Sequence, residues 1–218
     1  MKIKVNSIEI DYSKTGNGKP LILLHGNGED KSIFRQAIPM LNNFFTVYAL
    51  DTRGHGKSTS VDTFHYMDFA SDTAAFIEAL NIKKPTVLGF SDGGITALLL
   101  AIHYKNSVGK IIVSGANTSP EGLKDDVLQA MKHEYAEYPS PLLKLMLTEP
   151  HITKEELQEI EIPVLITAGE NDCIKPSETS FLHDNIKNSE LRILKGEDHS
   201  SYIAYSGKIA ELIINYDN

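Results

Sequence analysis

The stretch Pro85-Thr86-Val87-Leu88-Gly89-Phe90-Ser91-Asp92-Gly93-Gly94 decides the fold. Thr86 to Leu88 is a short apolar run typical of a buried strand, and the apolar residues after Gly94 recur at helical spacing. Ser91 lies two positions from a glycine on each side, which predicts a sharp strand-to-helix turn. A side chain at either glycine would collide with the neighbouring strand or helix. Such a turn strains Ser91 and points its hydroxyl outward, which favours a nucleophile.

Short apolar runs alternate with helical patterns along the rest of the chain. Further strands are expected at 21–24, 46–50, 110–113, 164–168 and 191–194, with a hairpin over 2–13, and helices at 29–41, 66–80, 92–105, 176–186 and 201–216. This alternation predicts an α/β fold, a doubly wound, mostly parallel sheet of about eight strands with helices on both faces. We expect a single domain over 1–218. Four prolines and two or three amphipathic helical stretches mark an insertion at 115–160.

Two more polar residues lie just past the carboxyl ends of expected strands. Asp172 follows the strand at 164–168, and His199 follows the strand at 191–194. In an open parallel sheet these strand ends share one edge, where ligands bind. We therefore expect Ser91, Asp172 and His199 to lie close together.

On these residues the chain resembles the α/β-hydrolase superfamily. The order Ser91, Asp172, His199 matches the family's order of nucleophile, acid and base. Two further segments match: the apolar run that ends in His-Gly-Asn-Gly at 25–28, and the loop at 51–58. The resemblance spans about residues 8 to 214 and is weakest between about 117 and 160.

The resemblance implies a serine hydrolase mechanism. Ser91 would attack a carbonyl carbon, His199 would accept its proton, and Asp172 would orient the imidazole. The backbone N–H groups of Asn27 and Asp92 would form the oxyanion hole, the second of them at a helix N-terminus that favours negative charge. The side-chain amide of Asn27 is a candidate third donor. The insertion at 115–160 is implied to be a short lid over the site.

Alternatives stay open for two of these assignments. Asp172 could be only a turn residue, and Glu170 is a neighbouring carboxylate. A family variant places the acid after the preceding strand, where this chain has Asn117, which cannot serve as an acid. The carboxylate of Asp92 could contact a polar substrate or cap the helix.

Composition narrows the class of partner. The net charge of −8 disfavours nucleic acid and anionic membranes. The single cysteine, Cys173, excludes an intramolecular disulfide, and we assign it no role. No signal-peptide pattern and no run of ~18 apolar residues is present, so a cytoplasmic location is expected. The expected partner is a small-molecule substrate, bound by a monomer or a homodimer.

The motifs predict neither a metal nor a cofactor. No two of the eight histidines are four residues apart, as the helical zinc-protease pattern requires. Gly54-His55-Gly56 lacks the third glycine of a dinucleotide fingerprint. His25 and His55 lie in glycine-rich loops, where we expect them to bond backbone groups.

The reaction expected from the resemblance is hydrolysis of small carboxylic esters through an acyl-enzyme. Lactone, thioester, amide and activated carbon–carbon bonds are alternatives, because the same three residues serve all of them. The Ser-Asp-Gly-Gly run at 91–94 is similar to amino-acid-ester hydrolases of the valacyclovir-hydrolase type, but four residues do not transfer a specificity. A receptor-like protein that retains the triad is the alternative of another class, and the short insertion disfavours it.

Overall fold

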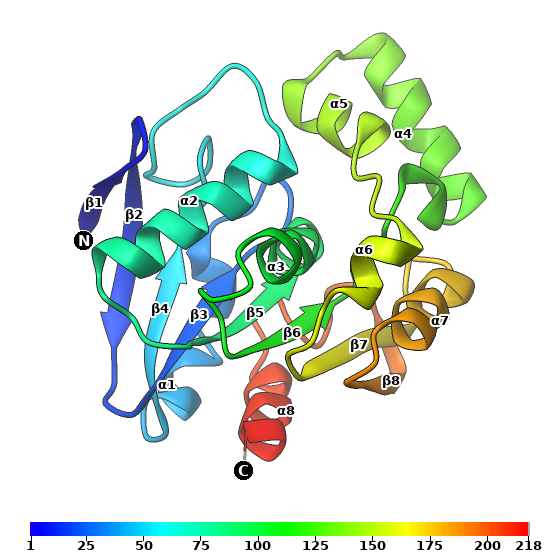
Figure 1. Cartoon of the computed structure of the whole chain (residues 1–218). Coiled ribbons are helices and arrows are strands. Elements are labelled where there is room, and N and C mark those ends of the chain that lie inside the picture. Colours follow the sequence, from blue (N-terminus) through cyan, green and yellow to red (C-terminus); the bar gives the residue numbers. More distant parts are fainter. Residues whose placement is uncertain (218) are drawn as a thin grey trace.

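The computed structural model describes residues 1–217 and contains one eight-stranded sheet (Figure 1). The strand order is β1-β2-β4-β3-β5-β6-β7-β8. The strands are β1 (Lys2–Val5), β2 (Ile8–Thr15), β3 (Lys19–Leu24), β4 (Phe45–Leu50), β5 (Thr86–Phe90), β6 (Lys110–Ser114), β7 (Val164–Asn171) and β8 (Ser189–Asp198). β2 pairs antiparallel with β1 and β4, and all other pairs are parallel. The predicted fold class is confirmed.

Helices cover both faces of this sheet (Figure 1). They are η1 (Lys31–Phe34), α1 (Ile38–Leu41), α2 (Tyr66–Ala79), α3 (Asp92–His103), η2 (Pro120–Gly122), α4 (Asp125–Glu137), α5 (Pro141–Thr148), α6 (Lys154–Gln158), α7 (Pro176–Asn185) and α8 (Lys208–Asp217). One apolar core packs α2, α3, α6 and α7 against the sheet, and a second packs η1, α1 and α8 against its other face. The central strands are therefore buried on both sides, which explains their continuous apolar runs.

Two expected helices differ from the structure. The helix expected at 29–41 is instead η1 and the single turn α1, with Pro39 near the start of the second. Proline has no N–H to continue a helix and clashes with the preceding turn. The last helix begins at Lys208 rather than at 201, because Tyr205 adopts a left-handed φ of 53° and donates its N–H to the Ile33 carbonyl. His199 therefore lies in the turn after β8 and does not begin a helix.

Helices α4, α5 and α6 occupy the insertion between β6 and β7; α4 and α5 lie at the edge of the molecule in Figure 1, whereas α6 lies closer to α3 and α7. Ser140 caps α5, and Thr153 forms a reciprocal capping box with Glu156 at the start of α6. Within residues 1–217, none of the helices is long and apolar enough to cross a bilayer.

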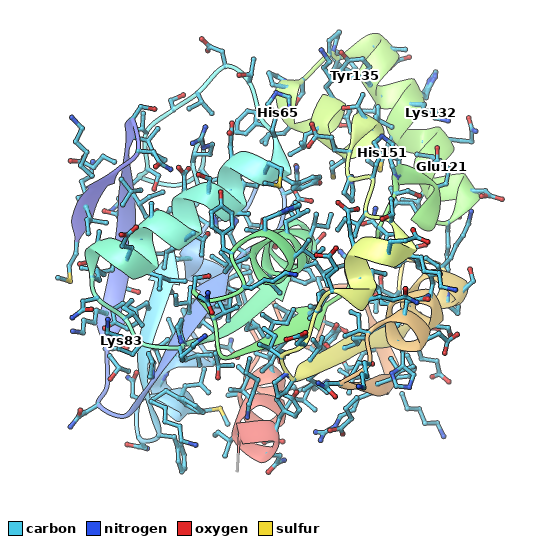
Figure 2. All side chains as sticks on the ribbon, viewed as in Figure 1. His65, Lys83, Glu121, Lys132, Tyr135 and His151 are labelled. Carbon is cyan, nitrogen blue, oxygen red and sulfur yellow. The ribbon has the colours of Figure 1, made fainter. Side chains whose placement is uncertain are left out.

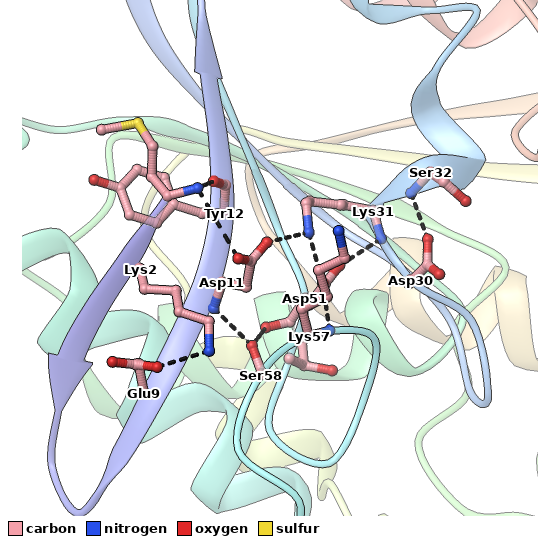
Figure 3. A network of polar contacts seen from close by, with 12 residues as sticks. Lys2, Glu9, Asp11, Tyr12, Asp30, Lys31, Ser32, Asp51, Lys57 and Ser58 are labelled. Carbon is pink, nitrogen blue, oxygen red and sulfur yellow. Dashed lines mark hydrogen bonds and ion pairs between the residues drawn. The ribbon is translucent and has the colours of Figure 1, made fainter.

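A network of charges ties the N-terminal strands to the loops around the candidate site (Figure 3). Lys31 Nζ contacts a carboxylate oxygen of Asp11 and lies 2.6 Å from Asp51 Oδ2. The side chain of Asp51 is only 1% exposed and also accepts N–H bonds from Lys31 and Lys57, each at 2.9 Å. Ser58 completes the network by donating to the Asp51 carbonyl and accepting from the Asp11 N–H. Lys31 thus neutralises two carboxylates that are largely removed from water.

We expect Lys31→Met to lower the free energy of unfolding by about 3 kcal/mol, since removing one partner leaves buried carboxylates without a counter-charge. Burial raises the pKa of Asp11, but Lys31 more than offsets this and the net shift is downward. The stabilisation is therefore present at neutral pH and is lost as the pH falls through the pKa of folded Asp11. Urea unfolding at pH 7 and at pH 3 measures both effects.

Lys2→Met is the matched control. Lys2 pairs with Glu9 at 2.7 Å, but both side chains are 49% exposed. Exposed pairs of this kind contribute little, so the unfolding midpoint should not change. Equal effects of the two substitutions would contradict the role given to Lys31.

Candidate active site

Ser91 lies in the sharp turn between β5 and α3, as the sequence predicts. Its backbone has φ 52° and ψ −116°, a conformation that a non-glycine residue rarely adopts. A Cβ added to Gly89 would lie 1.9 Å from the Gly93 carbonyl oxygen, and one added to Gly93 would lie 2.3 Å from the Leu24 carbonyl oxygen. These distances are shorter than van der Waals contact, so both positions require glycine. The turn is held by the Ser91 N–H, which donates to the Ser114 carbonyl at 2.8 Å.

The fold brings Ser91, His199 and Asp172 into one hydrogen-bonded chain. His199 Nε2 lies 3.1 Å from Ser91 Oγ, and His199 Nδ1 lies 2.7 Å from Asp172 Oδ1. Asp172 is buried and also accepts N–H bonds from Ile174 at 3.0 Å and Gly169 at 3.3 Å. The network assigns Nδ1–H as the donor to Asp172 and leaves Nε2 to accept the serine proton. This arrangement can raise the nucleophilicity of a serine hydroxyl.

Within this hydrogen-bonded series, Asp172 and His199 each stabilise the charged form of the other. Burial raises the pKa of Asp172, but the hydrogen bond and charge of His199 outweigh it and the pKa falls below its ordinary value. Burial likewise lowers the pKa of His199, but Asp172 and Cys173 outweigh it and the pKa of His199 is raised. The ion pair of an imidazolium with Asp172 is therefore favoured, which suits a step in which His199 gains a proton.

Gly115, just after β6, leaves space for the imidazole ring of His199. It has φ 61°, and a Cβ there would lie 2.9 Å from His199 Cε1 and 3.0 Å from His199 Nδ1. On another side, the ring of Phe90 lies 5.0 Å from the imidazole, centroid to centroid. The position of the imidazole is thus limited by packing as well as by hydrogen bonds.

The other residues considered for the acid do not contact His199 through any described hydrogen bond or ion pair. Glu170 is exposed, and its carboxylate accepts the Gly196 N–H at 2.9 Å. Asn117 donates its amide to the Ser119 carbonyl at 2.7 Å. Of these three candidates, Asp172 is the residue that the fold places beside the imidazole.

Asn27 and Asp92, the residues expected to supply oxyanion donors, are joined through their side chains. Asn27 Nδ2 donates to Asp92 Oδ2 at 2.8 Å and lies 3.5 Å from the Leu142 carbonyl. Within residues 1–217, neither backbone N–H has a described acceptor. The expectation of a third donor from the Asn27 amide is wrong, because both of its hydrogens point to other acceptors.

Asp92 neither caps α3 through its side chain nor faces solvent. It is 5% exposed, and its second oxygen accepts a hydrogen bond from Tyr66 Oη at 2.8 Å. Burial raises the pKa of Asp92, while the bonds from Asn27 and Tyr66 oppose that rise. The helical pattern of 66–80 gave no sign of this role for Tyr66, since an aromatic residue at the start of an amphipathic helix is most simply a core residue.

His25 and His55 bond backbone groups, as expected. His25 accepts the Thr52 N–H at 3.1 Å through Nε2, and its Nδ1 lies 2.7 Å from the Gly26 carbonyl. His55 accepts the Gly28 N–H at 3.2 Å. Burial lowers the pKa of His25 to about 4, so this ring stays neutral. The two rings fix the loop that carries Asn27.

Glu29 is a second carboxyl group near Ser91 that sequence reasoning missed. Its Oε2 accepts the Gly26 N–H at 2.9 Å, and a Cβ added to Gly26 would lie 2.9 Å from this oxygen and 3.2 Å from Ser91 Cβ. Burial raises the pKa of Glu29. The residue closes the turn at 26–29, which contains Asn27, and places a carboxyl group near the candidate nucleophile.

The insertion is attached to the rest of the chain on both sides of α5. At its start, the Leu142 carbonyl faces the Asn27 amide; at its end, Glu149 contacts His65 Nδ1 at 2.6 Å and accepts the Tyr66 N–H at 3.1 Å. A groove of about 370 Å³ lies between the 62–65 segment and the helices α4 and α5. Figure 2 labels two residues that line it, His65 and Tyr135.

Asp172, Cys173 and His199 form the one group in the described part of the chain whose side chains could hold a metal ion. One donor atom of each lies within 4.8 Å of the others. Cys173 and His199 are partly exposed, whereas Asp172 is buried. The search for histidine spacings could not reveal this group, because its members come together only through the fold.

Relatives of the chain include several hydrolases. It is 29% identical to the human serine hydrolase BPHL, over 97% of this chain and 84% of that protein. It is 26% identical to a pimeloyl-[acyl-carrier protein] methyl ester esterase of Neisseria meningitidis (89% and 91% covered) and 25% identical to 3-oxoadipate enol-lactonase 2 of Acinetobacter baylyi (91% and 90% covered).

Solved structures and the family profile agree with the fold. The structure of E-2-(acetamidomethylene)succinate hydrolase matches with a TM-score of 0.84 at 18% identity, over 100% of this chain and 98% of that one. The profile of the α/β-hydrolase fold family matches residues 19–139, which include the loop after β3 that carries Asn27, the Ser91 turn and α4. This match covers more than half of the chain, which therefore belongs to the α/β-hydrolase fold family.

Proposed function

We propose that the protein is a serine hydrolase that cleaves small carboxylic esters through an acyl-enzyme intermediate. The observation that carries the proposal is the hydrogen-bonded chain from Ser91 through His199 to Asp172, which begins at a serine with positive φ. A structural role for these residues would not require the strained turn, since an ordinary helix start would suffice. The relatives named above include an ester hydrolase and a lactonase, which supports the choice of bond.

In the proposed reaction Ser91 Oγ attacks the ester carbonyl as its proton passes to His199 Nε2. Asp172 stabilises the resulting imidazolium. The carbonyl oxygen becomes an oxyanion and accepts hydrogen bonds from the N–H groups of Asn27 and Asp92, which have no described acceptor in the chain. His199 then protonates the departing alcohol. Water, deprotonated by His199, hydrolyses the acyl-enzyme by the same steps in reverse.

The proposed lid consists of α4 to α6, and it limits substrate size. The groove of about 370 Å³ beside α5 is at the small end of the range for ligand pockets. Ser140 and Leu145, at the start and in the middle of α5, line this groove, and the same helix reaches Asn27 through Leu142. We propose that this groove holds the part of a small substrate that lies farthest from the ester, since Ser91, His199 and Asn27 do not line it.

Charge also narrows the proposed substrate. Glu29 and Asp92 lie near Ser91. Both accept hydrogen bonds from neutral donors, a backbone N–H for Glu29 and the Asn27 and Tyr66 side chains for Asp92. These carboxyl groups and the net charge of −8 disfavour an anionic substituent near Ser91 by long-range repulsion. Neutral or cationic esters are therefore the proposed class. Lactones stay an alternative within this class, because ring opening uses the same steps.

The first test is covalent labelling of Ser91. We expect a fluorophosphonate to add one adduct to the protein and to place it on the peptide that contains Ser91, because a strained, base-activated serine is the reactive hydroxyl. Intact mass and peptide mapping measure this. The Ser91→Ala variant should stay unlabelled and should not turn over p-nitrophenyl acetate. Labelling that persists in this variant would refute the assignment, and labelling without turnover would favour the receptor-like alternative.

The second test separates the two carboxylates near the end of β7. We expect Asp172→Asn to lower kcat by a factor on the order of 10⁴, because the histidine tautomer becomes wrong for accepting a proton. In the wild type, kcat/KM should rise with pH as His199 loses its proton, with an apparent pKa above about 6.5, since Asp172 raises it. Steady-state kinetics across pH measures both.

Glu170→Gln is the control for this experiment. Its carboxylate bonds the Gly196 N–H rather than the imidazole, so both kcat and the pH profile should be retained. A larger loss in this variant than in Asp172→Asn would show that the acid has been misassigned.

The third test is a series of p-nitrophenyl esters from acetate to palmitate. Each added CH₂ gains about 0.8 kcal/mol only while it is enclosed, so kcat/KM should peak at about two to six acyl carbons and then decline. No increase in activity should occur at an oil–water interface. Rates that climb to the longest chains would show that α4 to α6 enclose a long tunnel.

A further inference from the structure

We propose that Asp172, Cys173 and His199 form a binding site for a thiophilic divalent cation, such as Zn²⁺ or Cd²⁺, whose occupation switches off hydrolysis. The inhibitory consequence rests on the proposed function, whereas binding itself does not. The site combines one thiol, one imidazole and one carboxylate, whose donor atoms all lie within 4.8 Å of one another. These three ligand types are the ones that Zn²⁺ takes in proteins.

The distances suit a single ion after a small adjustment. With metal–ligand bonds of about 2.0 to 2.3 Å, two tetrahedral ligands lie roughly 3.5 Å apart. The donor atoms of the group therefore need to approach by little more than about 1 Å, while the His199 and Asp172 atoms that now share a proton must separate slightly. Water would complete the coordination, since Cys173 and His199 are partly exposed.

The surroundings of the group attract a cation. The carboxylate of Asp172 lies directly at this point, with Oδ1 2.7 Å from His199 Nδ1. Asp198 directly precedes His199 in the chain, and the chain has a net charge of −8. A divalent cation bound here would interact favourably with these negative charges, as a protonated His199 would.

Binding is incompatible with the role of His199 as a base. A metal on Nδ1 requires the tautomer with its hydrogen on Nε2, which cannot accept a proton from Ser91. A metal on Nε2 displaces the hydrogen bond to Ser91 Oγ that the structure shows at 3.1 Å. The thiol and any imidazolium release their protons to solvent as the ion binds, so affinity increases with pH.

Cys173 is the residue that distinguishes this site from a serine–histidine–aspartate chain alone. It follows Asp172 directly, at the start of the segment that leads to α7. Its sulfur is the soft ligand that favours Zn²⁺ and Cd²⁺ over Mg²⁺, which prefers oxygen. It takes no part in the proposed reaction, so its replacement tests the metal site without removing a reacting group.

The experiment measures binding and inhibition separately, with a phosphine reductant present to keep the thiol reduced. Cd²⁺ added to the wild type should produce the ultraviolet charge-transfer band of a metal thiolate. Zn²⁺ should inhibit turnover of p-nitrophenyl acetate, EDTA should restore it, and Mg²⁺ should have no effect. In Cys173→Ser the band should be absent, and half-inhibition, measured relative to the metal-free turnover of that variant, should need more than about tenfold more Zn²⁺ than in the wild type.

Ser91→Ala separates this proposal from the proposed function. The variant should show the same Cd²⁺ band as the wild type, because Ser91 is not a ligand, so binding can be measured even in a protein without ester turnover. Absence of the band in the wild type would overturn the proposal. Equal inhibition of the wild type and Cys173→Ser by Zn²⁺ would overturn it as well, since the inhibitory ion would then lie elsewhere.

Discussion

The close approach of the α3 backbone to β5 and β3 is the constraint on which the candidate site depends. Gly89 and Gly93 lie so near to each other and to the Leu24 carbonyl that no β-carbon fits at either position. This approach produces the positive φ of Ser91 and directs the first N–H groups of a buried helix toward the space around its hydroxyl. The strain at one residue is maintained by the burial of the whole of α3, whose residues are almost all inaccessible to water.

The imidazole reaches Ser91 because the last two parallel strands are long. In the pairing of β7 with β8, Val164 is opposite Ser189 at one end and Asn171 is opposite Asp198 at the other. The register is irregular between Gly169 and Asn171. A Cβ on Gly169 would lie 2.3 Å from the Asp198 carbonyl, so the two chains are unusually close just before Asp172 and His199. Their extended pairing carries both residues beyond the ends of the central strands, to the level of Ser91.

Much of the fold and of the site was predictable, because the signals were local. The apolar runs indicated the buried strands, and the glycine spacing around Ser91 indicated the turn. The break between η1 and α1 and the late start of α8 were missed, because Pro39 acts within a helical pattern and Tyr205 is held by a contact with the distant Ile33 carbonyl. The role of Tyr66 was missed because its partner Asp92 is distant in the sequence. Glu29 and Cys173 were missed because only the fold brings them near Ser91 and His199.

Asp92 shows why such long-range contacts matter for the proposed chemistry. A carboxylate beside the donors for an oxyanion is unfavourable by Coulomb's law alone. Here each carboxylate oxygen accepts one hydrogen bond, from Asn27 or from Tyr66, and these bonds stabilise the charge of Asp92 within the protein. The two hydrogen bonds to Asp92 also connect the loop after β3, the Ser91 turn and the start of α2.

The same network extends to the insertion. The Leu142 carbonyl of α5 faces the Asn27 amide, and Glu149 at the end of α5 accepts the N–H of Tyr66. Both ends of this helix therefore contact residues that bond Asp92. A substrate that displaces α5 would disturb the side-chain amide of Asn27 and the N–H of Tyr66 together. Substrate fit under the proposed lid and alignment of the proposed oxyanion donors are then one mechanical property, which links specificity to rate.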